Sequence, residues 1–189
     1  MKELHHFIAR YVPDLSPAFE EDLYRVFYTK KLKKGEHLIQ AGQISRTLYF
    51  VKKGMLRNYL IKNDKELTVW FFFPENFVTV FDSMILQIPG KENTIAMTPC
   101  ELYAIAYEKL EMLNKVSHEW EHISRVFTIE FALQQEMRLY MFQTMNAEEK
   151  YQFLLDMSPH IIENIPSKYI ASYLGISRET LSRIRGRIA

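Results

Sequence analysis

The sequence predicts an α+β fold, with a strand-rich front half followed by helices. Residues 28–106 hold short segments rich in aromatic and β-branched residues, separated by glycine, proline and polar turns. Residues 107–145 contain no proline or glycine, and their apolar residues lie mostly three and four positions apart. The remaining residues show the same helical spacing, interrupted at prolines. These three observations predict strands, then a long helix, then a helical C-terminal domain.

A helix is predicted at the start of the chain, where Ser16 is suited to the N-cap and Pro17 to the first helical position. The strand segments that follow are "HLIQ", "TLYFV", "MLRNYLI", "LTVWFFF", "TIAM" and "ELYAI", with Gly35, Gly42 and Gly54 among the turn residues. Many short strands at fairly even spacing predict a sandwich or barrel, with a mixed α+β domain as the alternative. The aromatic run of residues 70–73 is expected in the strand core.

The middle of the chain is predicted as one long amphipathic helix or two shorter ones. An unbroken helix over residues 117–145 would be about 43 Å long at 1.5 Å per residue. Its far part would leave Phe131, Met137 and Met141 in water, so we expect two copies of the chain to associate along it as a homodimer. The alternative is a helical hairpin within a monomer.

The tail "SKYIASYLGISRETLSRI" predicts a helix-turn-helix over residues 167–184. Ala171 lets two helices cross closely, Gly175 suits the positive φ of a tight turn, and Ser177 suits the N-cap of the second helix. Five apolar residues are expected to fill the angle between the helices: Ile170, Leu174, Ile176, Leu181 and Ile184. An ordinary helical hairpin with a basic face is the alternative.

The charge distribution indicates a polyanionic partner. The chain has a net charge of +1, but residues 165–189 hold five basic residues against one acid, so they carry +4 and the preceding residues −3. The first residues of a recognition helix meet base edges, where Arg pairs with guanine and Glu with cytosine. We therefore expect double-stranded DNA as the partner. Phosphate contacts are expected from Lys168, Arg185 and Arg187.

Composition and missing motifs argue against a membrane protein, a secreted protein and a nucleotide-binding enzyme. No apolar run is long enough for a membrane span, and the first residues lack the apolar core of a signal peptide, so we expect a cytoplasmic protein. Cys100 has no second cysteine with which to form a disulfide or zinc motif, and we expect it to be buried. Phosphate-loop and dinucleotide-binding glycine motifs are absent, and no cofactor is expected.

These residues closely resemble the Crp/Fnr transcription regulators. The resemblance rests on "IPSKYIASYLGISRETLSRI" and on "KKGEHLIQAGQISRTLYFVKKGMLR" in the front half. It implies a cyclic-nucleotide-binding-type β-roll, a double-stranded β-helix of jelly-roll kind, over residues 1–113. It also implies a dimerisation helix over residues 114–145 and an all-α helix-turn-helix domain over residues 146–189. Carried over by position, Arg178, Glu179 and Arg183 read bases. The adjoining Ser177, Thr180 and Ser182 are expected at the DNA backbone.

Two expectations concern the effector. Family members that bind cyclic AMP hold it with a glycine–acid pair and a later Arg-Ser pair, but here Glu75 and Asn76 stand at the first position and Gly90 and Lys91 near the second. An iron–sulfur cluster is excluded by the single cysteine. We expect a regulator that does not depend on cyclic AMP, with a ligand-responsive, cyclic-nucleotide-binding regulator as the alternative. Any pocket for an unidentified small-molecule effector is expected at Glu75, Asn76, Lys91 and Thr94.

One enzyme hypothesis stays open. Residues 118–122 read "HEWEH", the pattern in which His118 and His122 bind zinc and Glu119 acts as general base in metalloproteases. The pattern lacks the third ligand that usually follows it, although Glu136 or Glu148 could be proposed. A solvated helix face with Trp120 turned inward is the structural alternative, and the expectation is that the chain is not an enzyme.

Overall fold

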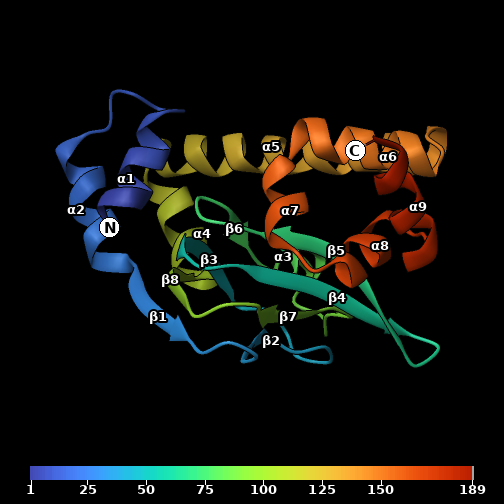
Figure 1. Cartoon of the computed structure of the whole chain (residues 1–189). Coiled ribbons are helices and arrows are strands. Elements are labelled where there is room, and N and C mark those ends of the chain that lie inside the picture. The colour runs from blue at the N-terminus through green and yellow to red at the C-terminus, as the bar shows by residue number, and fades with distance from the viewer. Residues whose placement is uncertain (189) are drawn as a thin grey trace. The chain divides into compact units, whose positions relative to one another are not determined.

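The computed structural model describes residues 1–188, in which helices and strands follow the order labelled in Figure 1. The helices are α1 (Lys2–Ala9), α2 (Pro17–Val26), α3 (Phe81–Leu86), α4 (Tyr107–Val116), α5 (His118–Thr144), α6 (Ala147–Met157), α7 (Pro159–Asn164), α8 (Ser167–Leu174) and α9 (Arg178–Ile188). The strands are β1 (Tyr28–Leu32), β2 (His37–Ile39), β3 (Thr47–Lys53), β4 (Leu56–Lys62), β5 (Lys65–Phe72), β6 (Phe77–Val78), β7 (Asn93–Ala96) and β8 (Cys100–Ala106).

The chain divides into two compact units. The first contains Met1–Leu60 and Phe71–Ile129, and the second contains Ile61–Trp70 together with residues 130–188. The second unit therefore combines the end of β4, the turn that follows it and most of β5 with the later part of α5 and the C-terminal helices. Within the described residues, no helix is long and apolar enough to span a membrane.

The strands form two four-stranded sheets, with orders β1-β8-β3-β6 and β2-β7-β4-β5. In the first sheet β8 pairs antiparallel with β1 and with β3, so that Ala104 lies opposite both Tyr28 and Tyr49. This arrangement confirms the predicted β-roll and each of the six predicted strand segments. Strands β1 and β6 and helix α3 were not specified, since β6 is only two residues long and α3 only six.

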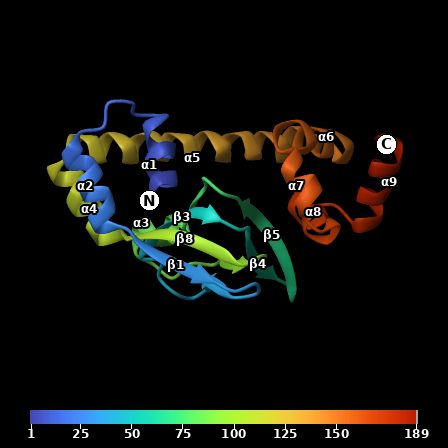
Figure 2. The same ribbon diagram turned by 60° about the vertical axis from the view of Figure 1, so that its left-hand side comes forward.

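Helices α1, α2 and α4 and the first part of α5 supply the helical side chains of the core of the first unit. Figure 2 shows these helices beside the strands of that unit. Phe7 of α1 stacks on Phe127 of α5 at 5.5 Å between ring centroids and also contacts Phe50 of β3 at 5.3 Å. Phe19 of α2 lies 4.6 Å from Trp120, whose side chain is buried as expected. The aromatic contacts therefore join α1 to both α5 and the first sheet, and α2 to α5.

The predicted start of α2 is confirmed. The Ser16 hydroxyl accepts the Phe19 N–H at 3.2 Å, and Pro17 occupies the first turn. Gly35, Gly42 and Gly54 lie at turns, as predicted, and all three have positive φ there. Gly54 also has no room for a side chain, because an added Cβ would lie 2.5 Å from the Pro99 carbonyl oxygen. Cys100, beside it, is buried, also as predicted.

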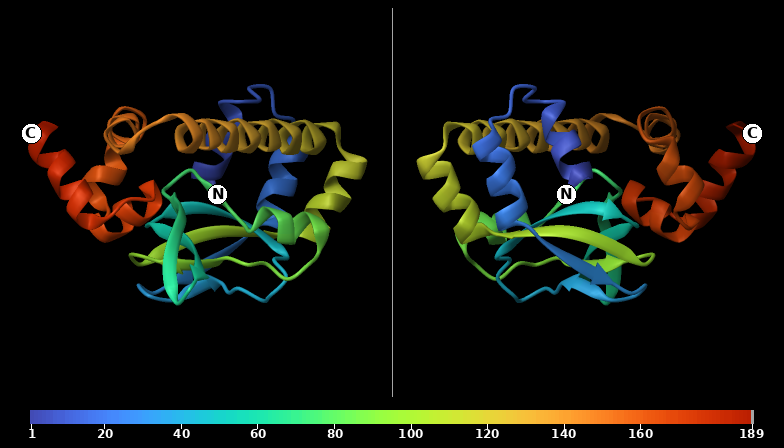
Figure 3. Two further views of the ribbon diagram at one scale, coloured as in Figure 1. Left: turned by 90° about the vertical axis from the view of Figure 1, so that its right-hand side faces the viewer. Right: turned by 90° about the vertical axis from the view of Figure 1, so that its left-hand side faces the viewer.

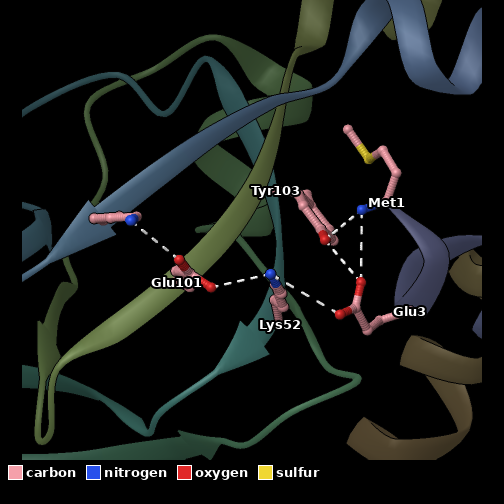
Figure 4. Close-up of polar contacts among 6 residues, drawn as sticks. Met1, Glu3, Lys52, Glu101 and Tyr103 are labelled. Atoms are coloured by element: carbon pink, nitrogen blue, oxygen red, sulfur yellow. Dashed lines mark hydrogen bonds and ion pairs between the residues drawn. The ribbon is translucent and has the colours of Figure 1, made fainter.

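A polar cluster joins α1 to the first sheet (Figure 4). The Tyr103 hydroxyl donates to Glu3 at 2.8 Å and accepts from the Met1 amino group, while Lys52 lies 3.1 Å from Glu101 and 3.9 Å from Glu3. Hydrogen bonds from its own backbone and from Tyr103 lower the pKa of Glu3 to about 2. Burial and the Glu3 carboxylate raise the pKa of Tyr103 to about 12. Glu3 is therefore held as a carboxylate at neutral pH.

The middle of the chain forms two helices, because the backbone is extended at Ser117 and separates α4 from α5. Along the later part of α5 the exposed apolar residues include Phe131, Leu133, Met137, Leu139 and Tyr140. The expectation that Met141 would also be in water is wrong: it is 2% exposed. This section of α5 belongs to the same compact unit as the C-terminal helices, which accounts for the burial of one side of the helix within a single chain.

Candidate nucleic-acid interface

Helices α8 and α9 are joined by a tight turn at Gly175. Gly175 has φ +69° and ψ +31°, the left-handed conformation, and ends α8. Its N–H donates to the Ser172 carbonyl at 3.3 Å, and the Ile176 N–H donates to the Ala171 carbonyl at 3.0 Å. These bonds satisfy carbonyls at the end of α8 and turn the chain into α9. The predicted helix-turn-helix and the conformation of its glycine are confirmed.

The angle between the two helices is filled as the spacing predicted. Ala171 is 2% exposed, so α9 approaches α8 closely at this position. Ile170, Leu174, Leu181 and Ile184 are also buried, whereas Ile176 is only partly covered. Tyr151 and Leu154 of α6 and Ile161 of α7 are buried in the same unit. Figure 3 shows α8 and α9 next to these two helices.

The N-terminus of α9 is capped and exposed. The Ser177 hydroxyl accepts the Thr180 N–H at 3.0 Å and lies 3.1 Å from the Thr180 hydroxyl, which confirms the predicted N-cap. Beside this cap, Arg178, Glu179 and Arg183 are all exposed. Hydrogen bonds from its own backbone N–H and from Ser177 lower the pKa of Glu179. The first turn of α9 thus presents the Glu179 carboxylate beside Arg178, and Arg183 follows one turn further along the helix.

The residues expected at the DNA backbone fall into two groups. Lys168 and Ser182 are exposed, and Arg187 is exposed with only a 3.5 Å ion pair to Glu148. Arg185 differs from them: its guanidinium donates to the Ser167 hydroxyl at 2.9 Å and lies 5.8 Å from the centre of the Tyr151 ring. The Arg185 guanidinium therefore faces α6 and α8 and not solvent.

Helix α8 is anchored to strand β5 by contacts that the sequence did not indicate. The Ser172 hydroxyl accepts the Thr68 N–H at 2.9 Å and donates to the Glu66 carbonyl at 3.3 Å. One position along, Tyr173 meets Trp70 edge to face, with ring centroids 6.2 Å apart. All of these residues lie in the second unit, where β5 runs beside α8 in Figure 3. The first helix of the motif is thus held on one side by a strand.

Arg138 joins the same helix to α5. Its guanidinium lies 5.7 Å from the centre of the Tyr173 ring and 5.2 Å from that of Phe142. Burial raises the pKa of Tyr173, and the neighbouring Arg138 opposes that rise. An added Cβ at Gly175 would lie 3.6 Å from Phe142, so α5 also packs beside the α8–α9 turn. The helix-turn-helix is therefore supported by α5 as well as by β5.

The four residues of the expected effector pocket have different surroundings. Glu75 forms a 2.6 Å ion pair with Arg10, and the Asn76 side chain accepts the Phe73 N–H at 3.0 Å. Lys91 is exposed, whereas Thr94 is fully buried and has no hydrogen-bond partner for its hydroxyl among residues 1–188.

Two polar side chains near Thr94 were not indicated by the sequence: Asn58, which is buried, and Glu92, which is partly buried. Asn58 of β4 lies directly opposite Thr94 of β7, and its amide donates to the Glu92 carboxylate at 2.5 Å. Asn58 is buried, and its Oδ1, like the Thr94 hydroxyl, lacks a partner within the described chain. A carboxylate thus lies between Lys91 and Thr94, in the segment where the resemblance would require a group that binds an anion.

The residues of the zinc hypothesis have other surroundings than a metal site requires. The His118 side chain is almost fully exposed, and the His118 and His122 ring centroids are 6.5 Å apart. The Glu119 carboxylate accepts the Ser16 N–H at 2.7 Å and the Ser16 hydroxyl at 2.5 Å, so it closes the start of α2. Within residues 1–188 no three His, Cys, Asp or Glu side chains lie close enough to hold a metal ion together. Glu119 thus has a structural role here.

Comparison with known proteins gives similarity at both the sequence and the fold level. Residues 29–115 match the family described as the cyclic nucleotide-binding domain. A fumarate and nitrate reduction regulatory protein of Vibrio cholerae is 28% identical over 173 residues, which cover 84% of this chain and 67% of that relative. FixK2 of Bradyrhizobium japonicum is 18% identical with a TM-score of 0.73, covering 86% of this chain and 84% of that one. Catabolite activator protein of Thermus thermophilus is 18% identical with a TM-score of 0.58, covering 92% and 84%.

Proposed function

We infer that this chain, a DNA-binding transcription regulator of the Crp/Fnr family, reads base sequence with the first two turns of α9. The observation that carries this inference is the capped, exposed N-terminus of α9, where Arg178, Glu179 and Arg183 stand clear of the protein core. Helix α8 lies behind α9 and is fixed to it through Ala171 and Gly175. A helix presented in this way fits the major groove of B-DNA, with its N-terminal residues at the base edges.

Each of the three exposed residues has a matching chemistry. The guanidinium groups of Arg178 and Arg183 can each donate two hydrogen bonds to O6 and N7 of a guanine. The Glu179 carboxylate accepts a hydrogen bond from the amino group of a cytosine, and its lowered pKa keeps it in the accepting form. The three residues therefore favour a half-site that contains G·C pairs.

The surrounding residues position the helix on the phosphates. Lys168 and Arg187 supply positive charge, and Ser177, Thr180 and Ser182 supply hydroxyl groups beside the reading residues. The Ser177 and Thr180 hydroxyls lie 3.1 Å apart and can turn toward a phosphate oxygen without leaving the cap. Arg185 is not among these contacts, because its guanidinium lies against Ser167 and Tyr151.

The regulator acts as a homodimer in this proposal. The exposed apolar side chains of Leu133, Met137 and Tyr140, which lie four and three positions apart on α5 and so share one side of the helix, form the face on which a second copy packs. Two recognition helices related by a two-fold axis would read a palindrome with half-site centres about 34 Å apart, one turn of DNA. Self-association thus sets the spacing of the operator.

The effector is not cyclic AMP in this proposal. Glu92 places a carboxylate in the segment that would have to bind a cyclic phosphate, and Asn58 donates to it. The nearest lysine, Lys91, is exposed. The chain is also proposed not to be an enzyme, since Glu119, the base of the zinc hypothesis, is engaged by Ser16. Stoichiometric zinc in the purified protein would contradict this.

Selection of bound fragments from random duplex DNA tests the proposal. The expected result is an enriched inverted repeat whose half-sites contain G·C pairs and lie one helical turn apart. Enrichment of a single asymmetric site would contradict the proposed homodimer, but it would still support recognition of base sequence by α9. Absence of any enriched sequence, at salt concentrations where the protein binds DNA, would overturn the proposed function.

A further inference from the structure

Arg185 is the arginine of α9 that faces inward. Arg178, Arg183 and Arg187 are exposed, whereas Arg185 is partly buried. Its Nη1 donates to the hydroxyl of Ser167, the first residue of α8, at 2.9 Å, and its guanidinium carbon lies 5.8 Å from the centre of the buried Tyr151 ring of α6. One side chain therefore touches all three helices α6, α8 and α9.

The remaining nitrogens of Arg185 are covered by protein. Nε and Nη2 are both buried, and neither has a hydrogen-bond partner among residues 1–188. A nitrogen that contacts a phosphate must be reachable from solvent, and the fork of an arginine presents these two donors together. Arg185 would have to leave Ser167 and Tyr151 before it could bind the DNA backbone in this way. A phosphate contact is therefore a poor explanation for this residue.

The position of the contact explains what it can do. Gly175 joins the end of α8 to the beginning of α9, and the Arg185–Ser167 bond joins the beginning of α8 to the later part of α9. The packing at Ala171 and the turn at Gly175 hold the two helices together near the turn, and the Arg185–Ser167 bond adds a second connection far from the turn, which further restricts the angle between them. The angle sets the direction in which Arg178 and Glu179 project, and a shift of about 1 Å there is enough to weaken directed hydrogen bonds.

We propose that Arg185 is a positioning residue for DNA reading: it fixes the angle between α8 and α9 through Ser167 and Tyr151, and it makes no phosphate contact. This proposal rests on the proposed function of α9. It differs from the expectation drawn from charge alone, under which Arg185 and Arg187 would have the same role.

The two roles are separated by the salt dependence of DNA binding. Each lost phosphate contact reduces the slope of log K against log salt concentration by about 0.9, whereas loss of a positioning residue leaves the slope unchanged. Loss of positioning lowers the ratio of affinities for the selected site and random DNA, because only directed base contacts depend on the helix angle.

The experiment compares Arg185→Met with Arg187→Ala on the selected duplex and on random duplex over a range of salt concentrations. Arg185→Met is expected to weaken the selected site roughly tenfold, to lower the ratio of selected to random affinity and to keep the wild-type slope. Arg187→Ala is expected to lower the slope and keep the ratio. Arg185→Lys, which keeps the charge but loses the planar fork, is expected to behave like Arg185→Met.

A second pair of variants distinguishes loss of the Arg185–Ser167 bond from a general loss of folding. Ser167→Ala removes only the hydroxyl, and it is expected to lower the same affinity ratio by a smaller factor. Adding Ser167→Ala to Arg185→Met should change little, because the bond is already lost. If Arg185→Met had a lower salt slope than the wild type and the same ratio of selected to random affinity, the positioning role alone would be overturned. A wild-type protein with no sequence preference would overturn both this proposal and the proposed function.

Discussion

The Ser172 hydroxyl accepts the backbone N–H of Thr68 at 2.9 Å, across 104 positions of the sequence. The same hydroxyl donates to the Glu66 carbonyl at 3.3 Å, so one small side chain bonds two backbone groups of the β4–β5 segment. Ser172→Ala should therefore lower the free energy of unfolding by about 0.5–1.5 kcal/mol, the usual net contribution of a hydrogen bond. Chemical denaturation measures this.

The control for Ser172→Ala is Ser182→Ala, measured without DNA. Ser182 is exposed on α9, and a surface change of this kind alters stability by less than about 0.5 kcal/mol. Equal unfolding curves for the two variants would show that the Ser172 bonds do not stabilise the protein.

Gly175 and Gly186 should respond in opposite ways to alanine. Gly175 has φ +69°, a conformation that disfavours a Cβ by roughly 1–2 kcal/mol, although space is available because the nearest atom would be 3.6 Å away. Gly186 lies in α9 with open space around it, so alanine there should stabilise the helix by about 0.5–1 kcal/mol. Thermal unfolding should show a lower midpoint for Gly175→Ala and a higher one for Gly186→Ala. A higher midpoint for both would mean that the turn tolerates a side chain.

The helix-turn-helix was predictable because its determinants are local. Ala171, Gly175 and Ser177 lie within seven consecutive positions, and each residue type has a geometric reason in a helix, a tight turn or a cap. The strands were predictable for a similar reason, since β-branched and aromatic runs between turn residues are read over a few positions. Short elements such as β6 carry too few residues for a pattern to form.

The side-chain contacts that hold the helix-turn-helix and the residues near Thr94 in place were not predictable, because they join parts of the chain that are distant in sequence. Nothing in the residues around Ser172 indicates strand β5, and nothing around Asn58 indicates Glu92. Arg185 illustrates the limit of net charge as evidence. The charge of the tail suggests that all of its arginines meet DNA, but Arg185 stands two positions from both Arg183 and Arg187 and so projects from the other side of α9. There the Ser167 hydroxyl and the buried Tyr151 hold it. Met141 was misjudged for the same reason, since helical periodicity does not reveal which elements cover a helix.

Arg178 and Lys168 should affect DNA binding differently. Arg178→Ala removes a base contact in the proposed function, so it should weaken the preferred site by about 1–3 kcal/mol and relax base choice at one position of each half-site. Lys168→Ala should weaken all sequences alike and lower the salt slope. Titration of both variants against the selected and random duplexes distinguishes these effects, and an unchanged base preference in Arg178→Ala would remove it from the reading residues.

Cyclic AMP and cyclic GMP should not stabilise the protein. A ligand at 100 times its Kd raises the free energy of unfolding by about 2.7 kcal/mol, which a thermal shift detects readily. The Glu92 carboxylate, held by Asn58, opposes an anionic phosphate in this segment, so no shift is expected with either nucleotide. Clear stabilisation by either one would contradict the inference from Glu92 and favour a ligand-responsive regulator.

Glu3 should make the stability of the protein depend on pH in the acid range. Its pKa is about 2 in the folded chain against an ordinary value of 4.5, so the folded state binds the proton less readily than the unfolded state. The contribution of Glu3 to stability is therefore complete above about pH 4.5 and is lost as the pH falls from there toward 2. In Glu3→Gln this part of the pH dependence should disappear, because the side chain no longer titrates.

Denaturant unfolding of both proteins between pH 7 and pH 2.5 measures the effect. The two stability curves should be separated at pH 7 and should converge as the pH falls, since protonation of Glu3 imitates the substitution. The Tyr103 hydroxyl, which donates to Glu3 at 2.8 Å, gives an independent check: Tyr103→Phe removes that donor and should bring the pKa of Glu3 closer to its ordinary value. Its acid-dependent loss of stability should then span a narrower pH range than that of the wild type. Parallel curves for wild type and Glu3→Gln would show that the carboxylate is not held by this cluster in solution.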